Sequence, residues 1–382
     1  MSIVIFVVIL LVLVLVHEFG HFFTAKKFGI RVDEFGFGFP PKLFGFKKGE
    51  TEYTFNLLPL GGFVKIFGES PDEESVSGPD AKRSFINKPK WQQAIVLFAG
   101  VFMNFMLAWF LFSVGFISGL PTSVGSAPAG YDLENVNLVI TSIAKESPAE
   151  KAGLKVGDKI IEISMPYSAN PEDYLRNPNP EELKNFITSH TQANEEYPLW
   201  IEYIRGKGQK MDYADEIGGE FAQVVPTREE GKDLIIGISM DQVGTAKLPV
   251  HRAFYEGLKL TLSVTKGTVV GLFSLLGQAI QGEGSMAAVT GPVGMVGIVG
   301  DAYEFGFVYL LSFAALISIN LAIINLFPFP ALDGGRLFFL LIEKIKGSHI
   351  NPKIANTANM IGFIILITLM LVITYHDVAK LF

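Results

Sequence analysis

The N-terminal apolar segment carries two histidines and a glutamate, and this combination constrains the fold most strongly. Residues 1–16 contain no charged side chain and lead directly into His17-Glu18-Phe19-Gly20-His21. A segment this apolar can cross a bilayer, where it satisfies its backbone hydrogen bonds only as a helix. Residues i and i+4 of a helix lie on one face, one turn apart. His17 and His21 therefore have the spacing of two zinc ligands, with Glu18 available as a general base.

Two simpler interpretations compete with a metal site. The HExxH pattern occurs by chance in many helices, and an N-terminal apolar run can be a cleaved signal peptide. A signal peptide is disfavoured because the first basic residue is Lys26 and no small-x-small cleavage motif follows the run. Ionisable side chains inside a spanning segment are costly, and a functional site is their default interpretation. We therefore favour metal binding.

Composition agrees with a membrane protein that has a sizeable soluble part. Of 382 residues, 49% are hydrophobic and 18% are charged, against about 25% charged in soluble domains. Cysteine is absent, so any zinc must be held by histidine and carboxylate side chains. The net charge of −7 argues against nucleic acid as a partner.

Four apolar segments are long enough to span the membrane. We place them at residues 1–25, 93–118, 305–328 and 355–377. Residues 251–300 are amphipathic and include Lys259 and Lys266, so we predict helices lying on the membrane surface there and not a fifth span.

The distribution of charge predicts how the chain is oriented. Segment 26–90 has eleven basic and nine acidic residues, and the short segment 336–353 has four basic residues and one acid. Segment 120–252 has thirteen basic and twenty-one acidic residues. Because basic loops remain on the cytoplasmic side, the first two segments are predicted to be cytoplasmic and the third extracytoplasmic. The ends of the first and third spans then lie at the same cytoplasmic depth.

A third zinc ligand is predicted at that depth. The segment from Asn325 to Arg336 reads NLFPFPALDGGR, in which two prolines end or unwind the third span and Gly334-Gly335 permits a sharp turn. Asp333 is thus expected on irregular backbone, which is tolerated at membrane depth only where it is buried or lines a wet cavity. A solvated turn or a helix cap is the alternative role for Asp333. The HExxH motif at matching depth favours the ligand.

These paired motifs resemble the site-2 protease family of intramembrane zinc metalloproteases, and in particular its bacterial regulator of sigma-E protease type. The run FAALISINLAIINLFPFPALDGGRLFFLLIEKIKG and the segment Gly36-Phe37-Gly38-Phe39-Pro40 carry the likeness, which extends over essentially the whole chain. One departure is Arg336, where the familiar pattern often has histidine. We expect this change to alter the surroundings of the ligand without loss of metal.

The resemblance implies roles for individual residues. His17, His21 and Asp333 would ligate Zn²⁺, and Glu18 would transfer a proton from the attacking water to the leaving amine. Asn325 corresponds to an asparagine that hydrogen-bonds the substrate backbone, and Asn104, in Gly100-Val101-Phe102-Met103-Asn104, matches a GxxxN position that faces the site or the substrate. For both asparagines, a hydrogen bond between helices of the bundle remains the alternative.

Residues 26–92 are expected to contain a membrane-associated sheet. Glycine alternates with aromatic residues here, and short hairpin strands are predicted at 35–38, 43–47, 51–57 and 62–67. By resemblance, an edge of this sheet pairs with unwound substrate, and we assign Phe37 and Gly38 to substrate binding. A small solvated sheet is the alternative. The polar segment 68–81 is predicted to be a loop.

Residues 121–245 differ in character from the spans. The string SPAEKAGLKVGDKIIEI resembles PDZ domains of bacterial envelope proteases, with a helix capped at Ser147 and started by Pro148. Only one such module is expected, where some relatives have two. It would take a peptide ligand by strand addition or filter substrates by size, and the sequence leaves both roles open.

The sequence thus predicts a multi-pass α-helical membrane protein with four spans, a membrane-associated β-hairpin sheet and one extracytoplasmic PDZ-like α+β domain. The predicted function is zinc endopeptidase cleavage of single-span proteins in regulated intramembrane proteolysis, with anti-sigma factors or signal-peptide remnants as substrates and membrane lipid as a further partner. A non-proteolytic scaffold is disfavoured because all the ligand positions and Glu18 are present. A metal transporter is disfavoured because inverted repeats are lacking.

Overall fold

The computed structural model describes residues 1–70, 73–166, 170–191, 198–205, 219–228, 234–282 and 290–379. It divides into two compact units. The first unit comprises residues 1–114, 253–300 and 310–382, and the second comprises residues 115–252 and 301–309.

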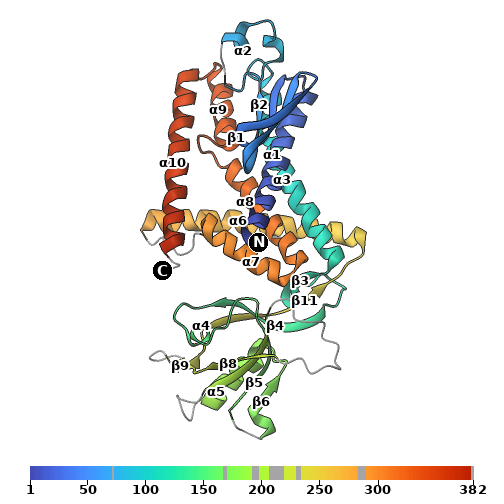
Figure 1. Ribbon diagram of the computed structural model, residues 1–382, viewed down its shortest axis with the longest axis vertical. Helices are drawn as coiled ribbons and strands as arrows, with labels where there is room; N and C mark the ends of the chain where they lie inside the picture. Colours follow the sequence, from blue (N-terminus) through green and yellow to red (C-terminus); the bar gives the residue numbers. More distant parts are fainter. Residues whose placement is uncertain are drawn as a thin grey trace. The chain divides into compact units, whose positions relative to one another are not determined.

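The first unit is mainly helical (Figure 1). Its long helices are α1 (Ser2–Lys27), α3 (Lys90–Ser118), α6 (Val250–Gln281), α8 (Phe307–Leu326) and α10 (Pro352–Ala379), of which α3, α6 and α8 have residues in the second unit. Shorter helices are α2 (Glu73–Ser77), the 3-10 turn η1 (Ala81–Arg83), α7 (Pro292–Phe305) and α9 (Asp333–Lys346). The segment 68–81, predicted to be a loop, therefore contains helix α2, and its last residue, Ala81, is the first residue of η1.

Five helices within the described residues are long and apolar enough to cross a membrane, namely α1, α3, α6, α8 and α10. Four of them coincide with the predicted spans. The fifth, α6, is a single helix of 32 residues where we predicted surface helices. Figure 1 shows α6 running across the direction of α1 and α10. The charged residues of α6 all lie within residues 250–266, as expected for a helix that contacts the membrane surface.

The core of the helical unit forms where small residues let helices approach. Ala108 and Phe112 of α3 pack against Ala315 and Ile319 of α8, with all four side chains buried. A second cluster joins the end of α1, the sheet and the start of α3, through Ala25, Ile30, Val32, Ile66, Phe85, Val96 and Leu97. The two clusters fix α3 against α8 and α1, the helices that supply the polar site described below.

The segment after α1 folds into a β-sheet made of β1 (Val32–Lys48) and β2 (Thr51–Ile66). Residues 34–37 have partners on both sides, at 62–65 and at 52–55, whereas residues 44–48 pair only with 51–55. The four short predicted strands are therefore stretches of two long, bulged strands. Residues 62–65 form one edge of the sheet and residues 44–48 the other. An aromatic stack of Phe37, Phe55 and Phe44, with ring centroids 4.5 Å apart at each step, covers one face.

The second unit is an α+β domain built on a seven-stranded sheet. The strands are β3 (Leu120–Ser123), β4 (Glu134–Ile143), β5 (Lys159–Ser164), β6 (Tyr174–Arg176), β7 (Leu199–Ile204), β8 (Glu220–Val224) and β11 (Ile238–Ala246). Their order in the sheet is β3-β11-β4-β5-β7-β8, and β6 pairs with β5. The remaining elements are α4 (Pro148–Lys151), α5 (Pro180–Thr191), β9 (Thr227–Arg228), β10 (Leu234–Ile235) and the 3-10 turns η2 (Val124–Ser126) and η3 (Pro171–Asp173).

The predicted cap of α4 is confirmed, since the Ser147 hydroxyl accepts the N–H of Glu150 and Pro148 is the first helical residue. A buried apolar cluster that includes Leu138, Ile160, Leu183 and Ile201 forms the core of this unit. Its assignment as a PDZ module stays a prediction.

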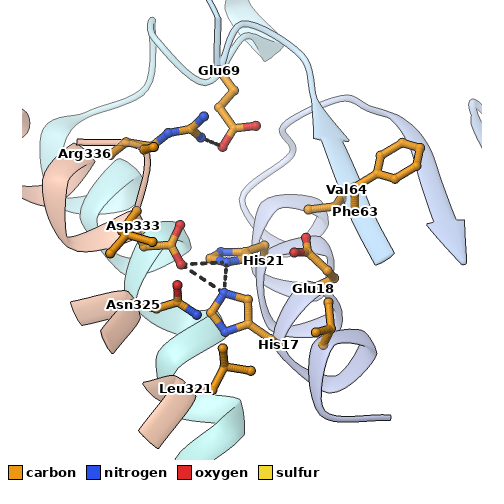
Figure 2. Close-up of a pocket in the computed structure, with 13 residues that line it drawn as sticks. His17, Glu18, His21, Phe63, Val64, Glu69, Leu321, Asn325, Asp333 and Arg336 are labelled. Atoms are coloured by element: carbon orange, nitrogen blue, oxygen red, sulfur yellow. Dashed lines mark hydrogen bonds and ion pairs between the residues drawn. The ribbon is translucent and has the colours of Figure 1, made fainter. Parts of the chain in front are cut away.

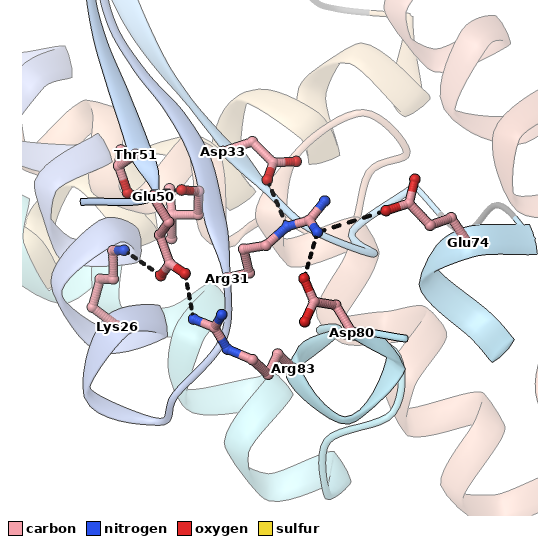
Figure 3. A network of polar contacts seen from close by, with 9 residues as sticks. Lys26, Arg31, Asp33, Glu50, Thr51, Glu74, Asp80 and Arg83 are labelled. Atoms are coloured by element: carbon pink, nitrogen blue, oxygen red, sulfur yellow. Dashed lines mark hydrogen bonds and ion pairs between the residues drawn. The ribbon is translucent and has the colours of Figure 1, made fainter. Parts of the chain in front are cut away.

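Ion pairs anchor the sheet to the end of α1 (Figure 3). The Glu50 carboxylate, in the turn between β1 and β2, accepts hydrogen bonds from Lys26 Nζ and Arg83 Nη2, both at 2.6 Å. Arg31, just before β1, donates to Asp33 and Asp80 at 2.8 Å each. Burial would raise the pKa of Glu50, but the hydrogen bonds from Lys26 and Arg83 outweigh it and hold this pKa below its ordinary value.

We therefore expect Glu50→Gln to destabilise the protein at neutral pH by on the order of 1 kcal/mol or less, because the pair is partly exposed. A lowered pKa in the folded state contributes stability above the ordinary glutamate value of about 4.3. The difference between variant and wild type should therefore narrow as the pH falls below that value. Thermal unfolding in detergent at pH 7 and at lower pH measures this difference.

Glu52→Gln is the matched control, because Glu52 pairs with Lys42 on the exposed side of the sheet. Its effect at pH 7 should be smaller than that of Glu50→Gln. Equal effects of the two variants, or a gap that widens in acid, would contradict the assignment.

Candidate metal centre

Three side chains from distant parts of the sequence converge in the first unit (Figure 2). His17 and His21 lie one turn apart on α1, and Asp333 is the first residue of α9. Asp333 Oδ2 lies 3.0 Å from His17 Nε2 and 3.2 Å from His21 Nε2, and the two Nε2 atoms are 3.1 Å apart. The structure thus brings the three predicted ligands together.

The donor set fits a zinc ion. Zn–N and Zn–O bonds of about 2.0–2.2 Å place the ligand atoms around a tetrahedral zinc roughly 3.3 Å apart, close to the three distances above. Both histidines are nearly buried, at 5% and 6% exposure. These three residues are the one group in the described chain whose histidine and carboxylate atoms cluster closely enough to hold a metal ion. Two imidazoles and one carboxylate are a ligand set found in catalytic zinc sites.

The close approach of α3 to α1 depends on two glycines. A Cβ atom added to Gly20 of α1 would overlap the backbone of Ala99 in α3. A Cβ atom added to Gly100 of α3 would lie 2.8 Å from His17 Cε1 and closer still to His21 Nε2. Real Cβ atoms do not approach other atoms this closely. Gly100 of the GxxxN pattern therefore leaves room for both histidine rings. From the sequence, Gly100 was expected only to let two helices approach closely.

Asp333 is presented by a tight turn at the end of α8. Ala331 has φ 77°, in the left-handed region, and its backbone N–H donates to the Asn359 side chain of α10 at 3.1 Å. Cβ atoms added to Gly334 or Gly335 would overlap the backbone carbonyls of Leu326 or Phe329. The irregular backbone predicted around Asp333 is confirmed for 327–332, but Asp333 itself begins a helix. A carboxylate at this position is favoured by the helix dipole.

A cavity of about 280 Å³ opens beside the three ligands. Its lining includes Glu18, Asn325, the edge-strand residues Phe63 and Val64, and the pair Glu69–Arg336. Figure 2 shows Glu18 facing Val64 on one side and the ion pair of Arg336 with Glu69 above Asp333. Val64, whose backbone N–H interacts with the Glu18 carboxylate, and Glu69 were not predicted, because no motif marks either residue.

The predicted substrate-binding residues are placed differently from one another. Asn325 lines the cavity beside the ligands. Phe37 and Gly38 belong to the sheet, where Phe37 pairs with Gly62 on one side and Phe55 on the other, and the Gly38 carbonyl accepts from Asn56. Asn104 is fully buried on α3, with its side-chain nitrogen 3.3 Å from His17 Nδ1. Their roles in substrate binding stay predictions.

These features define a metallopeptidase-type centre built into apolar helices. The chain matches the family described as Peptidase family M50 over residues 5–369. It is 33% identical over 387 residues to "Putative zinc metalloprotease FN1322" of Fusobacterium nucleatum, with 100% of each chain covered.

Two further relatives agree. The chain is 28% identical over 471 residues to "Regulator of sigma-E protease RseP" of Salmonella typhimurium, with 98% of each chain covered. It is 29% identical over 455 residues to "Zinc metalloprotease RasP" of Geobacillus kaustophilus, which covers 100% of this chain and 98% of that protein. The chain therefore belongs to Peptidase family M50, the site-2 protease family. It is an integral membrane zinc metalloendopeptidase.

Substituting Gly100 by alanine should abolish stable zinc binding, because the new methyl group would displace both histidine rings. The control is Gly271→Ala in α6, where an added Cβ meets nothing within 4 Å. This control should keep full zinc content and gain up to about 1 kcal/mol in stability, since alanine favours helix over glycine. Metal analysis of the purified proteins measures the zinc content. Full zinc content in Gly100→Ala would show that the two histidine rings do not need the space that Gly100 leaves.

Proposed function

We propose that this metalloprotease cleaves single-span membrane proteins within or beside the bilayer, with His17, His21 and Asp333 as zinc ligands and Glu18 as general base. The observation that carries the proposal is the convergence of the three ligand atoms next to a cavity that Glu18 also lines. When bound, the zinc ion would polarise the scissile carbonyl and lower the pKa of the attacking water. Glu18 would accept a proton from that water and deliver it to the leaving amine.

The sheet edge next to the cavity supports a way of holding the substrate. Proteolysis needs an extended peptide, whereas a membrane-spanning substrate begins as a helix. Residues 62–65 pair on one side with 34–37 and have no strand partner on the other side among the described residues. Phe63 and Val64 of this edge line the same cavity as Glu18. A substrate strand added here would gain backbone hydrogen bonds while passing the ligands.

The finer assignments follow from the charge pattern and the relatives. We propose that the protein lies in the inner (plasma) membrane and crosses it four times, with α1, α3, α8 and α10. Helix α6 would lie on the extracytoplasmic surface of that membrane. The zinc centre would face the cytoplasmic side and the second unit the extracytoplasmic side, where it would act as a PDZ module that takes a peptide or filters substrates by size. Anti-sigma factors already cut outside, or signal-peptide remnants, are the proposed substrates. The first class matches the name of the sigma-E relative.

Glu18→Gln should keep its zinc and lose cleavage of a model single-span substrate by at least about 100-fold, since a general base contributes about 10²–10⁴-fold. Asp333→Ala should lose both zinc and cleavage. The assay uses purified protein in detergent, with an anti-sigma-type and a signal-peptide-type substrate tested side by side. Wild-type cleavage by Glu18→Gln would rule out the proposed base. Unchanged zinc and activity in Asp333→Ala would remove Asp333 from the ligand set.

Val64→Pro should reduce cleavage strongly with zinc retained, because proline removes the backbone N–H that interacts with the Glu18 carboxylate beside the open edge. Val64→Ala is the matched control, since it shortens the side chain but keeps the N–H group. It should cleave close to wild type. Equal cleavage rates for the two variants would show that the Val64 N–H contributes neither to the position of Glu18 nor to the holding of a substrate strand.

A further inference from the structure

The two predicted histidine ligands differ in what their second ring nitrogens contact. A neutral imidazole that binds zinc through Nε2 carries its proton on Nδ1, and this N–H needs an acceptor. For His21 the acceptor is the backbone carbonyl of Val96, at 2.8 Å from Nδ1. For His17 the group next to Nδ1 is the side-chain amide of Asn104, at 3.3 Å.

The amide of Asn104 has one polar atom with no partner. Its Oδ1 is buried without a hydrogen bond in the described structure, while its Nδ2 is the atom that faces His17. A half turn of the amide about χ2 exchanges these two nearly isosteric atoms. Oδ1 would then accept from His17 Nδ1–H, the arrangement that a zinc ion on Nε2 requires.

The backbone of Asn104 is held so that this contact is fixed. The Ser318 hydroxyl of α8 donates to the Asn104 carbonyl at 2.8 Å, and both residues are fully buried. Gly100 lies one turn before Asn104 on the same face of α3 and lets that face contact both rings. Asn104 is also absent from the residues that line the cavity. It therefore lies behind the His17 ring and not on the side open to substrate.

We infer that Asn104 is a positioning residue for the metal centre, whose side-chain oxygen accepts the Nδ1–H of His17 and so fixes the tautomer and the ring orientation of this ligand. The inference rests on the proposed ligand set, and it replaces substrate binding as the role of Asn104. Groups that accept from the second nitrogen of a histidine ligand typically strengthen metal binding by about 10–100-fold. Gly100 and Asn104 of the GxxxN pattern then act on the same two histidines. Gly100 leaves room for both rings, and Asn104 holds the ring of His17.

The test measures zinc dissociation constants of the full-length protein in detergent by competition with a chelator of known affinity. Asn104→Leu, which has a similar size but no acceptor, should weaken zinc binding about 10–100-fold. Asn104→Asp keeps an acceptor and should bind zinc at least as tightly as wild type. Asn325→Leu removes the amide on the cavity side and should leave zinc affinity unchanged. With zinc saturating, Asn104→Leu should show no rise in the KM for substrate.

The outcomes separate this inference from the proposed function. Wild-type zinc affinity in His17→Ala would overturn the ligand set itself. Loss of affinity in His17→Ala with wild-type affinity in Asn104→Leu would overturn only the role of Asn104. Asn104→Asp binding zinc as weakly as Asn104→Leu would also overturn it, because the acceptor would then not matter. A raised KM in Asn104→Leu at unchanged zinc affinity would return Asn104 to substrate binding.

Discussion

The structure depends on bringing three polar groups together inside a bundle that is otherwise apolar. His17, Glu18 and His21 follow an apolar stretch of α1, and a lone charged or polar group inside a membrane would be costly. The approach of Asp333 to both histidines gives each of them a polar neighbour, and with the proposed ligand set a zinc ion would satisfy all three. The packing around them follows from this need, since α3 approaches α1 closely enough for Gly100 to lie against both rings and for Asn104 to contact His17. The two helix-to-helix contacts at Gly20 and Gly100 are therefore part of the metal centre as much as the ligands are.

The helices and the sheet contribute different groups to the site. The helices supply fixed side chains at membrane depth, where irregular backbone is tolerated only inside protein. The sheet supplies an edge, residues 62–65, that has no second strand partner among the described residues. Val64 lies where the two meet, because it belongs to the edge strand and also contacts Glu18. The Arg336–Glu69 pair joins the start of α9 to the segment after β2 above the same cavity. The element with Asp333 is thereby tied to the element that would hold the substrate.

The sequence identifies the three side chains that converge, because each of their motifs is local. The i, i+4 spacing of the histidines and the Pro-x-Pro-x-Leu-Asp-Gly-Gly run can each be recognised within a dozen residues. Residues that act through long-range contacts could not be found in this way. Val64 and Glu69 have no motif, and their position beside the site follows only from the register of the sheet. Residues 251–300 were predicted as surface helices, and the structure has helices α6 and α7 there, of which α6 runs unbroken for 32 residues. Asp333 was expected on irregular backbone and instead begins α9, since the dipeptide Gly334-Gly335 permits a helix to start directly against the end of α8.

The distance along the chain between the ligands has a consequence for how such a protease is made. His17 and Asp333 are 316 residues apart, so this length of polypeptide must be made after His17 before both can meet. Until then the emerging chain has two histidines in the membrane but no closed centre. With the proposed ligand set, the protease would therefore be inert until Asp333 has been made, and products truncated before Asp333 would be harmless to newly inserted proteins in the same membrane. The order of the motifs along the chain would then delay activation, as a separate propeptide does in other proteases.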